Sequence, residues 1–240
     1  MSNSGVRILV IDDEPPIRKL LRMGLGAQGY AITEAGNARF ALEALEAERP
    51  DLILLDLGLP DISGHDLLAR WRDDGLDLPV VVLSSRTDEA GIVRALELGA
   101  DDYVTKPFGM NELAARIRVA LRHRLQQQGE RPVFVTGGLS VDLVKRIVRV
   151  DGREVKLSPK EYDILRLLVQ HAGKVLTHHF LLEQVWDSTT DVQYLRVYVR
   201  QLRQKIEQTP DQPRYITTET GVGYRLAEAD PIEPASSGQN

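Results

Sequence analysis

Two apolar runs in the first quarter of the chain end in carboxylates. Residues 52–55, Leu-Ile-Leu-Leu, end at Asp56 and are followed by a turn signal, and residues 6–11 end at Asp12-Asp13-Glu14. Such runs predict parallel strands buried on both faces, whose carboxyl ends meet at one edge of a sheet. Three carboxylates at that edge would repel one another. The site therefore needs a counter-charge, and Mg²⁺ prefers oxygen ligands of this kind.

Two more predicted strands bring a hydroxyl and an amine to the same edge. Residues 78–83 end at Ser84, and residues 101–105 end at Lys106. Together the groups suit transient phosphorylation of a carboxylate. Asp56 would attack phosphorus, Mg²⁺ would neutralise the transferred oxygens, and Ser84 and Lys106 would bind the product phosphoryl group. A strand-end aspartate can also cap a helix and a lysine can be a solvated surface group, but the full set favours phosphoryl chemistry.

Length and composition indicate two ordinary domains inside the cell. The chain has 240 residues, 42% of them hydrophobic, and no cysteine, which excludes a disulfide framework and thiol chemistry. No apolar run reaches the ~18–20 residues that span a bilayer. We expect a cytoplasmic protein without membrane insertion.

Short apolar strands alternate with helical patterns over residues 1–123. The alternation predicts a doubly wound α/β domain, in which five βα units form a parallel sheet with helices on both faces. Residues 24–29 spell GxGxxG, but they end a helix, whereas a dinucleotide-binding loop opens one. Residues 124–132 lose apolar periodicity and read as a linker, and residues 229–240 read as a disordered tail.

Residues 133–228 predict a smaller α+β domain. Short strands at 133–135, 139–142, 147–150 and 154–157 come first. Ser158 then caps a helix with Glu161 in the capping-box position, and Thr177 can cap the next helix. Gly221 and Gly223 mark the turn of a closing hairpin, which has the form of a wing.

The helix predicted from Val192 to Gln208 carries a basic face in a chain of net charge −5. Arg196, Arg200 and Arg203 fall within a sector of about 60° beside its buried stripe. A solvated arginine face is the ordinary alternative, but the hairpin favours a recognition helix in the major groove of DNA, where arginine bonds guanine or grips phosphates. The predicted DNA contacts are Arg196, Val197, Tyr198, Arg200, Gln201, Arg203, Gln204 and, in the hairpin, Arg225.

The strand-end motifs are also those of a known family. In type, order and position they resemble the flavodoxin-like receiver domain of bacterial two-component response regulators over residues 6–123. The resemblance implies that Asp12, Asp13, Asp56 and the backbone carbonyl of Gly58 hold Mg²⁺. It also implies that Asp56 takes its phosphoryl group from a sensor histidine kinase, so the chain would be a phosphoacceptor and not an enzyme.

The same resemblance assigns a switch. Ser84 would be the switch hydroxyl and Tyr103 the switch aromatic, while Lys106 would bind the phosphoryl group and precede a cis peptide bond to Pro107. After phosphorylation, receivers of the OmpR/PhoB type dimerise through a symmetric face that carries acid–base pairs, and Asp101 with Arg116 of the partner is the first pair expected. The residues assigned to this face are Arg94, Glu97, Asp101, Asp102, Glu112, Arg116 and Arg118.

Residues 133–227 resemble the winged-helix DNA-binding domain of OmpR/PhoB-type regulators, including the closing Gly-x-Gly-Tyr-Arg. Runs at 172–177, 194–205 and 218–225 look most like regulators of a high-affinity potassium-uptake operon. The implied partners are double-stranded promoter DNA, RNA polymerase and the cognate kinase. A regulator of another regulon, for envelope, phosphate or metal stress, is the alternative.

Two further alternatives come from other classes of protein. A phosphatase of the haloacid-dehalogenase type uses an aspartyl-phosphate, but it carries a second aspartate two residues after the first, where this chain has Gly58. A DNA-binding protein whose receiver never signals would leave DNA affinity independent of phosphorylation.

Overall fold

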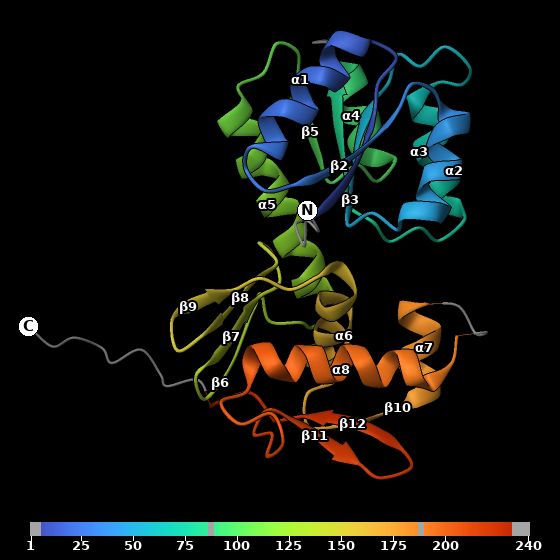
Figure 1. Cartoon of the computed structure of the whole chain (residues 1–240). Coiled ribbons are helices and arrows are strands. Elements are labelled where there is room, and N and C mark those ends of the chain that lie inside the picture. Colours follow the sequence, from blue (N-terminus) through green and yellow to red (C-terminus); the bar gives the residue numbers. More distant parts are fainter. Residues whose placement is uncertain (1–5, 86–88, 187–189, 232–240) are drawn as a thin grey trace, which may run out of the picture. The chain divides into compact units, whose positions relative to one another are not determined.

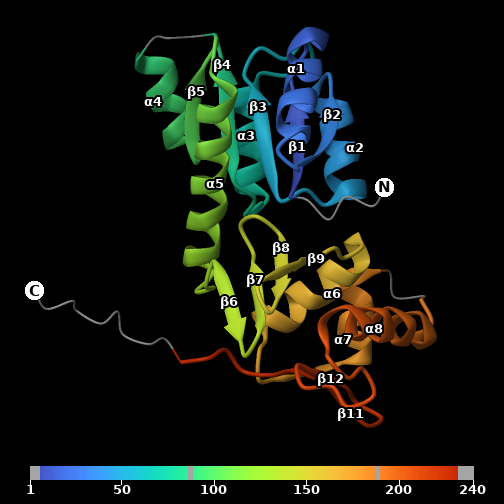
Figure 2. The same cartoon turned by 60° about the vertical axis from the view of Figure 1, so that its left-hand side comes forward.

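The computed structural model describes residues 6–85, 89–186 and 190–231. The chain divides into two compact units, one ending at Pro132 and the other beginning at Val133. Figures 1 and 2 show the elements of both units.

The first unit is built on a parallel sheet with the strand order β2-β1-β3-β4-β5. β3 and β4 are buried along their whole length, as their unbroken apolar runs predict. The register places Asp56 beside Leu83 and Ser84 beside Thr105, so the functional strand ends share one edge. The strands are β1 (Arg7–Ile11), β2 (Ala31–Ala35), β3 (Leu52–Asp56), β4 (Val80–Ser84) and β5 (Asp102–Thr105).

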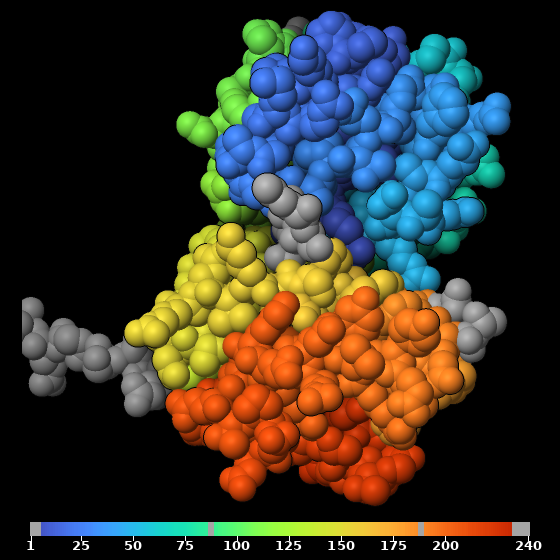
Figure 3. All heavy atoms as spheres, in the orientation of Figure 1, coloured from blue at the N-terminus to red at the C-terminus, as the bar shows by residue number. Residues whose placement is uncertain are grey.

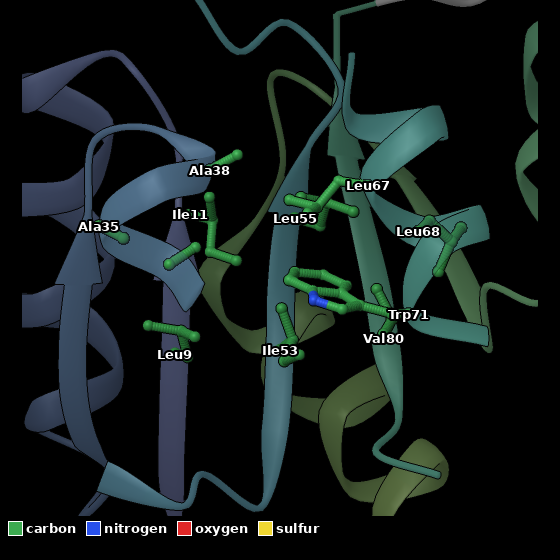
Figure 4. Packing of buried hydrophobic residues seen from close by; sticks show 11 residues of the cluster. Leu9, Ile11, Ala35, Ala38, Ile53, Leu55, Leu67, Leu68, Trp71 and Val80 are labelled. Atoms are coloured by element: carbon green, nitrogen blue, oxygen red, sulfur yellow. The ribbon is translucent and has the colours of Figure 1, made fainter. Parts of the chain in front are cut away.

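Helices cover both faces of this sheet, which confirms the doubly wound fold. On one face, Trp71 lies with Ile53 and Val80 in a core cluster that α2 and α3 cover (Figure 4). Ala95 of α4 packs with Val82 and Tyr103 in a neighbouring cluster. On the other face α1 packs against α5. The helices are α1 (Pro15–Gly26), α2 (Ala38–Glu48), α3 (Gly64–Asp73), α4 (Glu89–Glu97) and α5 (Met110–Gln127).

The predicted linker begins too early. Residues 124–127 belong to α5, which ends at Gln127. Leu125 is buried and extends the apolar face of that helix, and the Arg124 guanidinium donates a hydrogen bond to the carbonyl oxygen of Asp51. Because Leu125 is buried and Arg124 has a partner in the first unit, the helix persists beyond the point where apolar periodicity fades in the sequence.

Arg72 of α3 joins three segments of the first unit. Its guanidinium donates to the carbonyl oxygens of Gly99 (2.8 and 3.0 Å), Leu76 (2.5 Å) and Leu78 (2.9 Å), and to Asp101 Oδ2 (3.1 Å). Both the loop that follows α3 and the loop that follows α4 are thereby fixed to one side chain.

Truncating Arg72 to alanine is expected to lower the free energy of unfolding of the first unit by about 3 kcal/mol, because partly buried carbonyls lose charged donors. Chemical denaturation followed by circular dichroism measures this. Arg70→Ala is the matched control: Arg70 is two-thirds exposed and, among the described residues, pairs with Asp74 alone at 3.8 Å, so its loss should change stability by less than ~0.5 kcal/mol. Equal losses in the two variants would contradict the role given to Arg72.

The second unit begins with an antiparallel sheet in the order β6-β7-β8-β9. Its last strand ends at Val155, earlier than predicted, because Leu157 turns into the core and Ser158 caps the next helix with the expected capping box. The elements are β6 (Val133–Thr136), β7 (Leu139–Asp142), β8 (Ile147–Val150), β9 (Arg153–Val155), α6 (Pro159–Gln170), α7 (His178–Val185) and α8 (Val192–Ile206).

A second small sheet completes this unit, in the order β10-β12-β11. β11 (Ile216–Glu219) and β12 (Gly223–Leu226) form the predicted hairpin. β10 (Val175–Thr177) was not predicted. It is three residues long and lies between Gly173, which follows α6, and Thr177, which caps α7, and so short a segment carries no strand pattern. Gly223 allows the pairing: a Cβ there would lie 1.8 Å from the carbonyl oxygen of Leu176.

The predicted disordered tail also begins too early. The backbone N–H of Asp230 donates to the carbonyl oxygen of Val135 (2.7 Å), and the Asp230 carboxylate accepts from the N–H of Gly137 (2.8 Å). These bonds tie residues 229–231 to β6. Residues 232–240 lie outside the described part of the chain. Within the described part, no helix has the length and apolar character that crossing a bilayer requires.

Candidate phosphoacceptor site and DNA interface

The three predicted metal ligands lie together at the carboxyl edge of the parallel sheet. Asp12 and Asp13 follow β1 and Asp56 ends β3, and one carboxylate oxygen of each lies within 4.8 Å of the others. Asp12 and Asp56 are buried, whereas Asp13 is exposed. A set of three hard oxygen donors, one of them open to solvent, fits a Mg²⁺ ion.

Lys106 connects this carboxylate cluster to β5. Its Nζ lies 2.7 Å from Asp12 Oδ2, 2.5 Å from Asp56 Oδ2 and 3.3 Å from Glu14 Oε1. Burial alone would lower the pKa of Lys106, but the hydrogen bonds that its ammonium group donates to Asp12 and Asp56 raise it well above its usual value. Burial raises the pKa of Asp12, although Lys106 opposes that rise. The ammonium group of Lys106 is therefore held at the phosphoacceptor Asp56. The peptide bond between Lys106 and Pro107 is cis, as the resemblance implied.

The loop after β3 is fixed at two points beside Asp56. The backbone N–H of Gly58 donates to Asp56 Oδ1 (3.0 Å). Further along, the Asp61 carboxylate accepts from the backbone N–H groups of Ala38 and Arg39, each at 3.1 Å, at the start of α2. Burial would raise the pKa of Asp61, but these N–H groups lower it below its usual value. The loop thus presents the Asp56 carboxylate from an anchored backbone.

Ser84 and Tyr103 lie on neighbouring strands, Ser84 at the carboxyl edge of the sheet and Tyr103 two residues before the end of β5. Ser84 is the last residue of β4 and is buried. The Tyr103 ring is also buried, and it packs with Leu57, Val82 and Ala95 of α4. Tyr103 therefore already points inward in this structure, between the phosphoacceptor loop and α4.

Several residues assigned to the dimer face have partners within their own chain. Asp101 bonds Arg72 and the backbone N–H of Val80 (2.8 Å) in its own chain, and Arg116 pairs with Asp102 (3.0 Å), so the pair expected between Asp101 and Arg116 of a partner has competing partners here. Arg116 also pairs with Glu112 at 2.9 Å.

Arg118 is placed elsewhere by the structure. It lies about 200° around α5 from Arg116, and its guanidinium lies near the hydroxyl of Tyr30. Burial raises the pKa of that hydroxyl and Arg118 opposes the rise. The resemblance assigned Arg118 to the dimer face together with Arg116, whereas the helical period directs these two side chains to different sides of α5. Arg94 and Glu97 remain exposed on α4, beside the exposed Val93 and Leu96.

In the second unit α8 carries most of the predicted DNA contacts at the surface. Asp191 caps the helix by accepting from the N–H of Gln193 (2.8 Å). Its buried stripe is the predicted one and packs toward α6 and α7. The exposed members of the predicted set are Arg196, Val197, Arg200, Gln201 and Gln204.

Three members of the predicted set have partners inside the domain. Arg203 donates to the carbonyl oxygen of Ile216 (2.7 and 3.0 Å) and to Thr218 Oγ1 (2.7 Å), so it ties α8 to β11. Arg225 pairs with Glu219 at 2.6 Å across the hairpin. The Tyr198 ring lies 5.3 Å from that of Trp186.

Glu207 is a positioning residue that the sequence did not reveal. Its buried carboxylate accepts from the backbone N–H groups of Arg214 (2.8 Å), Tyr215 (2.9 Å) and Ile216 (2.9 Å). The contact fixes the path from the end of α8 to β11. No periodicity marks such a residue, because its partners are backbone groups seven to nine positions away.

Two protein families match the chain, one in each of its two units. The family of the response regulator receiver domain matches residues 8–118, and that of the transcriptional regulatory protein C-terminal domain matches residues 152–226.

Several relatives resemble the chain along most of their length. The transcriptional regulatory protein KdpE of Mycobacterium tuberculosis is 47% identical over 222 residues, which cover 91% of this chain and 98% of that protein. The KDP operon transcriptional regulatory protein KdpE of Escherichia coli is 43% identical over 221 residues, with the same coverage. The solved structure of the response regulator DrrB of Thermotoga maritima is 31% identical, covers 92% of this chain and 99% of that chain, and gives a TM-score of 0.44. The chain therefore belongs to the OmpR/PhoB-type response regulators of two-component systems, which join a receiver domain to a DNA-binding domain, and KdpE proteins are among its relatives.

Proposed function

We propose that phosphorylation of Asp56 controls promoter binding by α8, and that the regulated genes include a potassium-uptake operon. The observation that carries the first part is the position of Lys106 Nζ, within hydrogen-bonding distance of both Asp56 and Asp12. A cation held at a strand-end carboxylate stabilises the charge that a phosphoryl group brings.

The proposed reaction moves one phosphoryl group from a phosphohistidine of a KdpD-like sensor kinase. A bond forms between an Asp56 carboxylate oxygen and phosphorus, while the bond from phosphorus to the donor's imidazole nitrogen breaks. Lys106 then shifts its hydrogen bond from the carboxylate to a phosphoryl oxygen, and the Ser84 hydroxyl donates to another.

Asp12, Asp13, Asp56 and the carbonyl oxygen of Gly58 are the groups that would hold Mg²⁺. When bound, the ion supplies positive charge that offsets the carboxylates and the phosphoryl oxygens. We assign the chain no turnover of external substrates, because Gly58 has no carboxylate to serve as the acid and base of a phosphatase.

The proposed coupling is a shift of population between two arrangements of β4, β5 and α4. Ser84 and Tyr103 adjoin the site, and Tyr103 contacts the layer to which α4 belongs. The phosphoryl group would stabilise the arrangement whose α4–β5–α5 face forms a homodimer. Two α8 helices would then bind two half-sites of a promoter in the cytoplasm and act there on RNA polymerase.

The potassium assignment rests on similarity to the KdpE relatives. It is tested by the genomic fragments that beryllofluoride-activated protein retains, with Asp56→Asn treated in the same way as the control. Enrichment upstream of a potassium-uptake operon, for wild type only, is expected. Activation-dependent enrichment elsewhere would refute the potassium assignment but not the switch, and would favour a regulon for envelope, phosphate or metal stress. Equal retention by the two proteins would refute the switch.

A further inference from the structure

The surface of α8 is divided into three lengthwise zones. Opposite the buried stripe runs a line of exposed, uncharged side chains, here named the central line. At 100° per residue its members lie within about 40° of one direction. The central line consists of Gln193, Val197, Gln201 and Gln204.

Cationic side chains flank the central line on one side. Arg196 and Arg200 are exposed, and neither makes an ion pair with a residue of the described ranges 6–85, 89–186 and 190–231. They line a hollow of about 470 Å³ with Tyr224 of β12, and Asp211 is the one acidic group among the described residues that line it. The positive charge of α8 therefore lies toward the hairpin and not on the central line.

Tyrosine and lysine side chains flank the other side. Tyr198 and Lys205 line a second hollow with Ser158 and the first residues of α6, and Gln201 and Gln204 of the central line border it. Lys205 Nζ is bound to the buried carboxylate of Glu161 at 2.6 Å, so this flank is occupied by contacts within the domain. The atoms of α8 lie at the surface of the second unit in Figure 3.

A helix that lies in the major groove directs its outermost line at the base edges and its flanks at the two phosphate backbones. The cationic flank of α8 is suited to phosphates. The central line offers amides and one branched apolar group, Val197, whose side chain is 52% exposed. A glutamine amide matches the N6 and N7 groups of adenine, and an apolar side chain matches the methyl group of thymine.

We infer that the central line reads A·T base pairs: Gln201 bonds an adenine, and Val197 contacts a thymine methyl. The two residues are four positions apart, about 6 Å along the helix, which corresponds to about two base pairs. Arg196 and Arg200 supply affinity without sequence preference. The inference rests on the DNA binding of this family and adds which bases this chain recognises.

The test begins with selection of double-stranded DNA from a random pool by the full-length, beryllofluoride-activated protein. Each thymine of the selected half-site is then replaced by uracil, which removes only the methyl group, and each adenine by 7-deazaadenine, which removes only N7. Affinities are measured for wild type, Val197→Ala and Gln201→Ala. Arg200→Gln is the control from the cationic flank.

One uracil substitution is expected to weaken wild-type binding about fourfold and to have no effect on Val197→Ala. One 7-deazaadenine substitution, about two base pairs away, should weaken wild-type binding about tenfold and leave Gln201→Ala unchanged. Arg200→Gln should keep both penalties, bind all sequences more weakly, and lower the slope of log affinity against log salt by about 0.9.

A selected half-site with G·C pairs in these positions would overturn the inference, as would penalties that persist in the Val197 and Gln201 variants. In both cases DNA binding itself would stand. Failure to retain any sequence from the pool would instead overturn the inference together with the proposed function.

Discussion

Replacing Gly64 by alanine is expected to destabilise the first unit by about 3 kcal/mol and to abolish uptake of a phosphoryl group from acetyl phosphate. Gly64 begins α3, and its backbone N–H donates to the carbonyl oxygen of Leu57. A Cβ there would lie 2.5 Å from the backbone oxygen of Asp56 and 2.6 Å from the Cα of Leu57. Backbone atoms cannot rotate aside, so the end of β3 must move, and Asp56 moves with it.

The measurement is denaturant unfolding followed through Trp71, in a Trp186→Phe background, so that fluorescence reports the first unit alone. Gly26→Ala is the matched control, because Gly26 is the last residue of α1 and nothing lies within 4 Å of an added Cβ. It should be neutral or stabilising by less than ~1 kcal/mol. A Gly64→Ala protein with wild-type stability and phosphoryl uptake would contradict the close approach of α3 to β3.

Truncation of Glu207 to alanine should have a similarly large effect on the second unit, a loss of about 3–5 kcal/mol. The carboxylate accepts three backbone N–H groups, and each buried donor left without a partner costs about 1–3 kcal/mol. DNA affinity should fall as well, since the contact fixes the hairpin beside α8.

Two variants accompany Glu207→Ala, and all are followed through Trp186 in a Trp71→Phe background. Glu207→Gln keeps one oxygen for Tyr215 and Ile216 but sets an amide N–H against that of Arg214, so an intermediate loss is expected. Glu154→Ala removes an exposed carboxylate of β9 and should change stability by less than ~0.5 kcal/mol. Equal stability of the three variants would refute the role assigned to Glu207.

Much of the first unit could be predicted because its signals are local. Unbroken apolar runs identify strands buried on both faces, and the residue that ends each run must lie at the carboxyl edge. Asp12, Asp56, Ser84 and Lys106 were placed in this way. In the second unit the capping box at Ser158 and the buried stripe of α8 were equally visible, because both depend on spacings within one helix.

What sequence could not supply are contacts between distant side chains and backbone groups. Arg72 reads as one more surface arginine of α3, and Glu207 as a solvated residue in the last turn of the predicted basic helix, yet each organises loops by bonding carbonyl or N–H groups. Arg203 was assigned from its place on the basic face of the helix and Arg118 from the resemblance, but the structure bonds Arg203 to β11 and places Arg118 near the hydroxyl of Tyr30. β10 and the last turn of α5 depend on tertiary neighbours that no local pattern records.

The most direct test of the central claim is the equilibrium affinity of the full chain for its selected half-site DNA, measured with and without beryllofluoride and Mg²⁺. Wild type should bind at least about tenfold more tightly when activated, as expected for coupling of 1–3 kcal/mol between two sites. Asp56→Asn should bind with the same affinity in both conditions. If wild type also binds equally in both, or if Asp56→Asn responds to beryllofluoride as wild type does, phosphorylation of Asp56 does not control DNA binding by this protein.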